Sequence, residues 1–138
     1  MDLEKAVIIG GLAHLGILSA GLVMTKVLNW QKELKNLDQL SQHIIWTHAA
    51  YVWLVILAFG LVSVLYPSSL VNQDPLGIAT CGFISLFWGI RLIIQFFYFD
   101  AKPYLTDAKL KLGFHSLTVC FTYFTVVYGW VFVNGVIK

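Results

Sequence analysis

The sequence falls into four long apolar stretches that are separated by shorter polar connections. The stretches cover residues 6–28, 44–66, 76–99 and 112–137. Each is near the roughly 20 residues that an α-helix needs to cross the hydrocarbon of a membrane. None alternates apolar and polar residues, which disfavours a transmembrane β-barrel. The pattern therefore predicts an all-α integral membrane protein in which residues 1–138 form a single transmembrane domain.

Prolines and capping residues mark the connections and predict how the helices are joined. Pro67 ends the second stretch, Asp74 and Pro75 suit the start of the third, and Pro103 follows the third. Short connections join antiparallel neighbours in helical bundles. We therefore expect an antiparallel four-helix bundle with an up-down-up-down course.

The longest connection, residues 29–43, has its own pattern. Trp30, Leu34, Leu37 and Ile44 recur at intervals of three, four and seven, with charged residues between them. This spacing predicts an amphipathic helix that extends a transmembrane helix or lies among the lipid headgroups. A solvated connector along the membrane and a docking surface for a partner both remain open.

Composition and charge support a membrane protein and indicate its orientation. The chain is 59% hydrophobic and 12% charged, whereas an ordinary soluble domain is roughly 25% charged. Most lysines flank the ends of the first and third stretches, namely Lys26, Lys32, Lys35, Lys102, Lys109 and Lys111. The positive-inside rule places this end in the cytoplasm and both termini outside it. We expect a bacterial inner (cytoplasmic) membrane, with the lipid bilayer as partner and no nucleic acid.

The two acids among the first five residues disfavour a cleaved signal peptide and predict that the first stretch is retained as a helix.

The third stretch contains the most unusual polar residue, Arg91. On a helix it shares a face with Gln95 and Tyr98, and with the small residues Gly77 and Thr80. An ionisable group that faces lipid is costly, so this face should point into the bundle. Arg91 needs a counter-charge, carbonyl groups or water, and Asp100 lies about 13 Å further along an ideal helix, too far for direct contact.

Four histidines occupy different depths. His48 and His115 lie about 7 and 5 Å from the cytoplasmic ends of their helices, and His43 lies at the headgroup level. His14 lies near the midplane on a stripe that includes Gly10 and Gly11, and it is a further candidate cofactor-binding residue in the neighbourhood of Arg91. We expect the stripes that carry His14 and His115 to face the bundle interior.

Haem b is the first specific cofactor hypothesis. His48, or else His43, and His115 lie on helices that are diagonal in a simple bundle, at matching depth, and can supply two axial imidazoles. Arg91 can pair with a haem propionate. This layout resembles that of four-helix membrane cytochromes, which implies electron transfer in the membrane.

Quinone binding is a second redox hypothesis. A histidine with Arg91 or Gln95 can hydrogen-bond a quinone ring, and Trp88, Phe97 and Tyr98 can stack against it.

Two non-redox classes remain open. Arg91 on a polar stripe suits a small anion or proton transporter that acts as a homo-oligomer. A chain with almost no residues outside the membrane also suits an accessory or assembly subunit of a larger membrane complex. Nothing in the sequence supports hydrolytic catalysis, because every acid lies at or beyond a helix end and no nucleophile motif occurs. Whether the protein is an enzyme stays open.

The sequence therefore predicts an internal polar site in the cytoplasmic leaflet. Arg91 and Gln95 face it, and His48, Tyr98, His115 and Thr118 form its walls. The site should hold an anionic or redox-active ligand. The two cysteines, at positions 81 and 120, fall about 14 Å apart in depth and should not form a disulfide.

Overall fold

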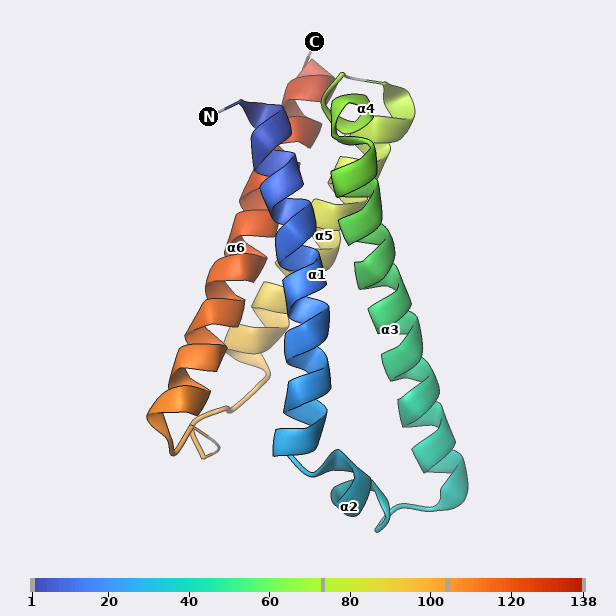
Figure 1. Ribbon diagram of the computed structural model, residues 1–138, viewed down its shortest axis with the longest axis vertical. Coiled ribbons are helices and arrows are strands. Elements are labelled where there is room, and N and C mark those ends of the chain that lie inside the picture. Colours follow the sequence, from blue (N-terminus) through green and yellow to red (C-terminus); the bar gives the residue numbers. More distant parts are fainter. Residues whose placement is uncertain (1, 73, 104, 138) are drawn as a thin grey trace.

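The computed structural model describes residues 2–72, 74–103 and 105–137, which form an all-α bundle (Figure 1). Within these residues the long helices are α1 (Leu3–Val27), α3 (Gln39–Leu65), α5 (Pro75–Phe97) and α6 (Ala108–Ile137). The short helices α2 (Trp30–Leu34) and α4 (Pro67–Val71) lie in connections. All four long helices are long and apolar enough to cross a membrane. The predicted four-helix integral membrane fold, with its contact to a lipid bilayer, is confirmed.

Local capping explains why helix ends differ from the limits of the apolar stretches. The Asp38 carboxylate accepts hydrogen bonds from the Ser41 backbone N–H (3.0 Å) and hydroxyl (2.6 Å), so α3 begins at Gln39 instead of 44. Asn29 has a left-handed backbone (φ 49°), which separates α1 from α2. The expected amphipathic connector is therefore a short helix, a turn and the first residues of α3.

The other long helices also extend beyond their apolar stretches or end before them. Helix α1 begins at Leu3 instead of 6, and α6 begins at Ala108 instead of 112. Helix α5 ends at Phe97, two residues before the apolar run does. Hydropathy indicates which residues can lie in the hydrocarbon of a membrane, whereas hydrogen bonding at the helix ends decides where a helix begins and ends.

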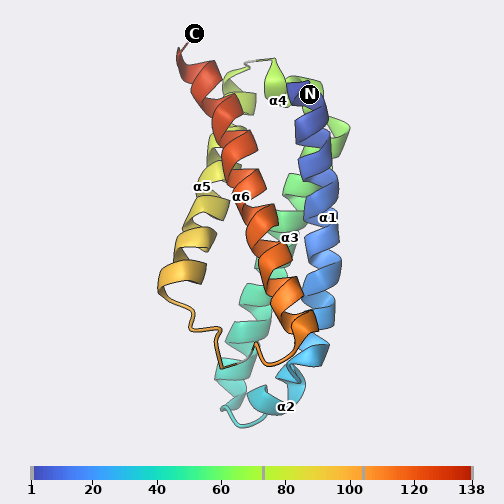
Figure 2. The same cartoon turned by 90° about the vertical axis from the view of Figure 1, so that its left-hand side faces the viewer.

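The long helices pack as two antiparallel pairs, α1 with α3 and α5 with α6 (Figures 1 and 2). Helix α1 also contacts α6, and α4 packs across α1 and α5. Gly11 and Gly60 allow α1 and α3 to approach closely, because a Cβ at Gly11 would lie 3.0 Å from the Gly60 carbonyl oxygen. Small residues at a crossing are the usual way in which membrane helices approach one another.

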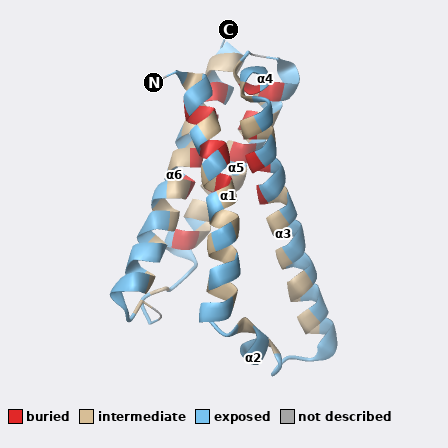
Figure 3. Ribbon diagram, in the orientation of Figure 1, coloured by how far each residue is buried: buried red, intermediate tan, exposed pale blue. Residues whose placement is uncertain are grey.

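The two ends of the bundle differ in how well they are packed. Buried residues concentrate near the termini and α4, and the helices diverge towards α2 (Figure 3). We call residues 3–18, 55–88 and 121–137 the packed half, and residues 19–54 and 89–118 the open half. Gln95 is the one buried residue among those described in the open half. The open half carries the lysine-rich connections that were expected to face the cytoplasm.

The cysteines lie on different helices in different surroundings. Cys81 is buried on α5 and Cys120 is half-buried on α6, and both are free thiols. The expectation that they do not form a disulfide is confirmed.

Candidate functional site

His14 joins all four long helices at the centre of the packed half. Its ring stacks on Phe124 of α6, with centroids 3.9 Å apart, and meets Phe59 of α3 edge-on at 5.8 Å. Its Nε2 accepts a hydrogen bond from the indole N–H of Trp88 on α5 at 2.8 Å. Its side chain is fully buried, as the glycine stripe of α1 predicted.

The hydrogen bonds of His14 fix its protonation state. An indole N–H only donates, so Nε2 is unprotonated and Nδ1 donates to the Gly10 carbonyl oxygen at 2.7 Å. Both nitrogens are therefore occupied within the protein, and no lone pair is left for an external ligand. This arrangement assigns His14 a structural role in helix packing.

A second buried hydrogen bond adjoins the histidine. The Tyr128 hydroxyl of α6 donates to the Ser63 hydroxyl of α3 at 2.7 Å, and both side chains are fully buried. Gly10 makes room for this ring, since a Cβ there would lie 2.9 Å from the Tyr128 oxygen. The sequence analysis did not single out Tyr128 or Ser63, because their pairing joins residues 65 positions apart.

Arg91 lies where the bundle begins to open. Its guanidinium carbon lies 5.1 Å from the centre of the Phe99 ring and 5.3 Å from that of Phe121, so the cation contacts two aromatic rings. Its Nη1 atom is buried and has no hydrogen-bond partner among residues 2–72, 74–103 and 105–137. The face of α5 that was predicted to point inward does so at Arg91 and Gln95.

Gln95 is held in place one turn further along α5. It is 4% exposed, and its amide donates to the hydroxyl of Thr118 on α6. That hydroxyl donates in turn to the Phe114 carbonyl oxygen at 2.9 Å. The predicted proximity of Gln95 and Thr118 is therefore present, and it fixes the position of the amide beside Arg91.

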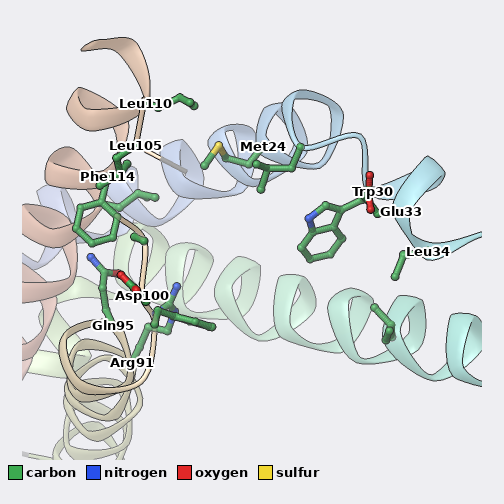
Figure 4. Close-up of a pocket in the computed structure, with 15 residues that line it drawn as sticks. Met24, Trp30, Glu33, Leu34, Arg91, Gln95, Asp100, Leu105, Leu110 and Phe114 are labelled. Carbon is green, nitrogen blue, oxygen red and sulfur yellow. The ribbon is translucent and has the colours of Figure 1, made fainter. Parts of the chain in front are cut away.

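Arg91 and Gln95 line a cavity of about 650 Å³, which we call the Arg91 cavity. Its remaining walls are mainly apolar and come from every helix except α4; they include Met24, Leu28, Ile45, Leu110, Phe114 and Leu117. Figure 4 shows Arg91, Gln95 and Asp100 gathered at one end, and Trp30, Glu33 and Leu34 at the other. The cavity is thus an apolar chamber with Arg91, Gln95 and Asp100 at one end and the Glu33 carboxylate at the other.

Asp100 reaches this cavity because α5 ends at Phe97. On a continued helix it would lie about 13 Å beyond Arg91, but the chain turns and brings it to the cavity wall. Within the described part of the chain, the only ion pair is between Lys5 and Asp2. Asp100 therefore lies near Arg91 without forming a salt bridge to it.

The other predicted wall residues lie elsewhere. His48, His115 and Tyr98 are exposed and do not line the Arg91 cavity, and Tyr98 lies just beyond the end of α5 at 82% exposure. His43 is exposed in the first turns of α3. The helices diverge in the open half, so equal depth does not bring side chains on α3 and α6 together.

His48 lines a second cavity of about 600 Å³ between α1 and α3, which we call the α1/α3 cavity. Its Nδ1 lies 2.8 Å from the Ile44 carbonyl oxygen of the preceding turn. Thr25, Ala49, Val52 and Trp53 also line this cavity. His115 does not line it, so the two expected haem ligands share neither of these two cavities.

Comparison of the chain with models of protein families, with curated proteins and with solved structures found no match. The geometry of the Arg91 cavity is therefore the basis on which a function is inferred.

Proposed function

We propose that the protein binds an amphiphile with an oxyanion head, a phosphate or a carboxylate, and that Arg91 receives this head in the Arg91 cavity. The observation that carries the proposal is the buried Nη1 atom of Arg91, which has no hydrogen-bond partner among the described residues. Arg91 is also the only arginine in the chain. A guanidinium presents paired donors that match the oxygens of a phosphate or carboxylate.

The energetics of burial favour an anionic ligand. Removing a charge from water costs several kcal/mol unless a partner compensates it. The rings of Phe99 and Phe121 offset part of this cost, because a cation–π contact contributes about 0.5–1 kcal/mol at an exposed site and about 2 kcal/mol when it is desolvated. Asp100 lies at the same end of the cavity but forms no salt bridge to Arg91 in the described part of the chain. An oxyanion would satisfy the remaining donor and pair with the guanidinium, whereas a neutral quinone carbonyl would only satisfy the donor.

The rest of the cavity favours an apolar chain behind that head. Its walls are mainly aliphatic and aromatic, and its volume of about 650 Å³ lies within the roughly 300–1,000 Å³ of small-molecule sites. The long helices around it are apolar enough to span a membrane. A ligand that reaches the cavity from the bilayer therefore needs both an acidic head and a lipid-soluble body.

The other hypotheses stay predictions. Haem b between His48 and His115 would require the open half to close, because both side chains are exposed and share neither cavity. Quinone binding, electron transfer, anion transport, an oligomer and a role as accessory subunit likewise stay predictions. So do the bacterial inner membrane and termini outside the cytoplasm.

The test is lipid binding measured by native mass spectrometry of delipidated protein in a neutral detergent. The probes are phosphatidic acid, phosphatidylcholine with the same acyl chains, and inorganic phosphate. Wild type should retain phosphatidic acid in preference to phosphatidylcholine. Arg91→Gln should weaken phosphatidic acid binding by about tenfold or more, because hydrogen bonds to charged groups contribute about 1.5–3 kcal/mol.

Lys109→Gln is the matched control. It removes the same charge from the same end of the bundle, but Lys109 is exposed and lines neither cavity. It should bind phosphatidic acid like wild type. The proposal fails if Arg91→Gln binds like wild type, if phosphatidylcholine binds equally well, or if inorganic phosphate displaces the lipid at comparable concentration. The last result would identify a free anion as the ligand.

A further inference from the structure

The α1/α3 cavity adjoins the Arg91 cavity. Three residues line both: Met24 near the end of α1, Trp30 at the start of α2, and Ile45 on α3. Arg91 lies at the end of its cavity that is remote from Trp30 (Figure 4). Going from Arg91 towards the space between α1 and α3, one therefore meets the first chamber, then the boundary that Met24, Trp30 and Ile45 share, and then the second chamber.

The second chamber has the chemistry of a site for an apolar chain. Its lining is dominated by aliphatic and aromatic side chains. The polar groups are few, and the hydroxyl of Thr25 already donates to the Leu22 carbonyl oxygen at 2.8 Å. Among the described residues, no Asp, Glu, Lys or Arg lines this chamber, whereas Glu33, Arg91 and Asp100 line the first one. The first chamber thus supplies the charged groups that can bind a polar head, and the second supplies mainly apolar contacts.

The position of the second chamber gives it an exit to lipid. It lies between α1 and α3 where these helices diverge, and its walls include the exposed His48 and Val52. Gly21 and Trp53 also line it, and they are close neighbours, since a Cβ at Gly21 would lie 3.4 Å from the indole nitrogen. A chain that leaves the Arg91 cavity by this route reaches the outer surface of the bundle between two membrane-spanning helices.

We propose that the α1/α3 cavity holds the hydrocarbon chain of a lipid whose oxyanion head binds Arg91, so that the ligand is a long-chain anionic lipid that enters between α1 and α3. This inference rests on the proposed function and adds the class of ligand and its route. A ligand with a short body would occupy the first chamber alone. A hydrocarbon chain that is long enough to pass Trp30 contacts the walls of both chambers. The protein should therefore bind such a chain in preference to a shorter one.

The test is photo-crosslinking with phosphatidic acid that carries a diazirine near the end of one acyl chain. In wild type, cross-links should concentrate on the lining of the α1/α3 cavity, at Thr25, Ala49, Val52 and Trp53. Ala49→Phe places a ring in this cavity alone. It should lower the yield at these residues severalfold, because the added ring takes up part of the roughly 600 Å³ that the hydrocarbon chain would occupy.

Ala50→Phe is the matched control, since Ala50 is exposed on the next position of α3 and lines neither cavity. It should give the wild-type pattern. Cross-links spread evenly over the exposed faces of all four helices, or unchanged by Ala49→Phe, would overturn this inference even if binding still depends on Arg91. Binding of the unlabelled lipid that does not depend on Arg91 would instead overturn the proposed function.

Discussion

The packed half and the open half each contain one basic side chain deep in the bundle, but they treat it differently. His14 is fully buried, and both of its ring nitrogens have partners within the protein. Arg91 has aromatic neighbours, but its Nη1 has no hydrogen-bond partner in the described part of the chain. A satisfied polar group stabilises packing, whereas the unsatisfied one beside a cavity is the observation that supports the proposed anionic ligand.

The helix contacts in the two halves show the same contrast. In the packed half, Gly11 and Gly60 bring two backbones together. In the open half, a Cβ at Gly21 or Gly89 would come no closer than 3.4 Å to another residue, and a Cβ at Gly113 would meet nothing within 4 Å. We therefore expect substitutions in the packed half to reduce stability, and substitutions around Arg91 to reduce binding while leaving the fold intact.

A large loss of stability is expected for Gly11→Ile, at the crossing of α1 and α3. A Cβ at Gly11 would lie 2.7 Å from Val64, 2.9 Å from Ser63 and 3.0 Å from the Gly60 carbonyl oxygen. Overpacking costs about 1–3 kcal/mol, and contact with backbone that cannot move aside favours the upper end. Thermal unfolding in detergent measures the loss. Gly16→Ile on the same helix is the control, because nothing lies within 4 Å there, and an equal loss in both variants would contradict the assigned crossing.

A loss of at least similar size is expected when His14 is replaced, but not when His115 is. His14→Ala leaves a cavity between four aromatic rings and leaves the Trp88 indole N–H without its acceptor. Core truncations cost about 2–5 kcal/mol, so the unfolding temperature should fall clearly. His115→Ala should have little effect, because His115 is exposed. Comparable losses in the two variants would contradict the assignment of a stabilising role to the buried His14 and not to the exposed His115.

The smallest effect is expected at Asp38, which caps the N-terminus of α3 and is not part of the packed core. Hydrogen bonds from the Ser41 hydroxyl and backbone N–H lower the pKa of the Asp38 carboxyl. A lowered folded-state pKa means that the cap is kept above the ordinary carboxyl pKa and lost as pH falls through the lowered value. The protection of the amides in the first turn of α3, taken relative to their intrinsic exchange rate at each pH, should fall in Asp38→Ala and in wild type on acidification. Unchanged protection at Ser41 would rule out the cap.

Much of the fold follows from local properties of the sequence. Each membrane span is recognisable by itself, because length and apolar composition are properties of one segment. The inward faces of α1 and α5 were also predictable, since glycines accompany His14 and an arginine avoids lipid. The α3 boundary was missed because capping by Asp38 outweighed the end of the apolar run.

The arrangement of the site was less predictable, because it depends on contacts between helices. Depth along a helix placed His48 and His115 in the same leaflet, but it carries no information on whether α3 and α6 diverge. The bond between His14 and Trp88 joins residues 74 positions apart, and no local pattern indicates it. Asp100 entered the cavity because α5 ended before the apolar run did.

The most direct test of an anion-binding Arg91 uses the fact that the chain has a single arginine. Labelling with ¹⁵N-arginine gives one guanidinium Nε signal, which can be followed by NMR in a neutral detergent. The account predicts that phosphatidic acid shifts this signal in a saturable manner, and that phosphatidylcholine with the same chains does not. A signal that stays in place at saturating phosphatidic acid, or that moves equally with both lipids, would contradict the account.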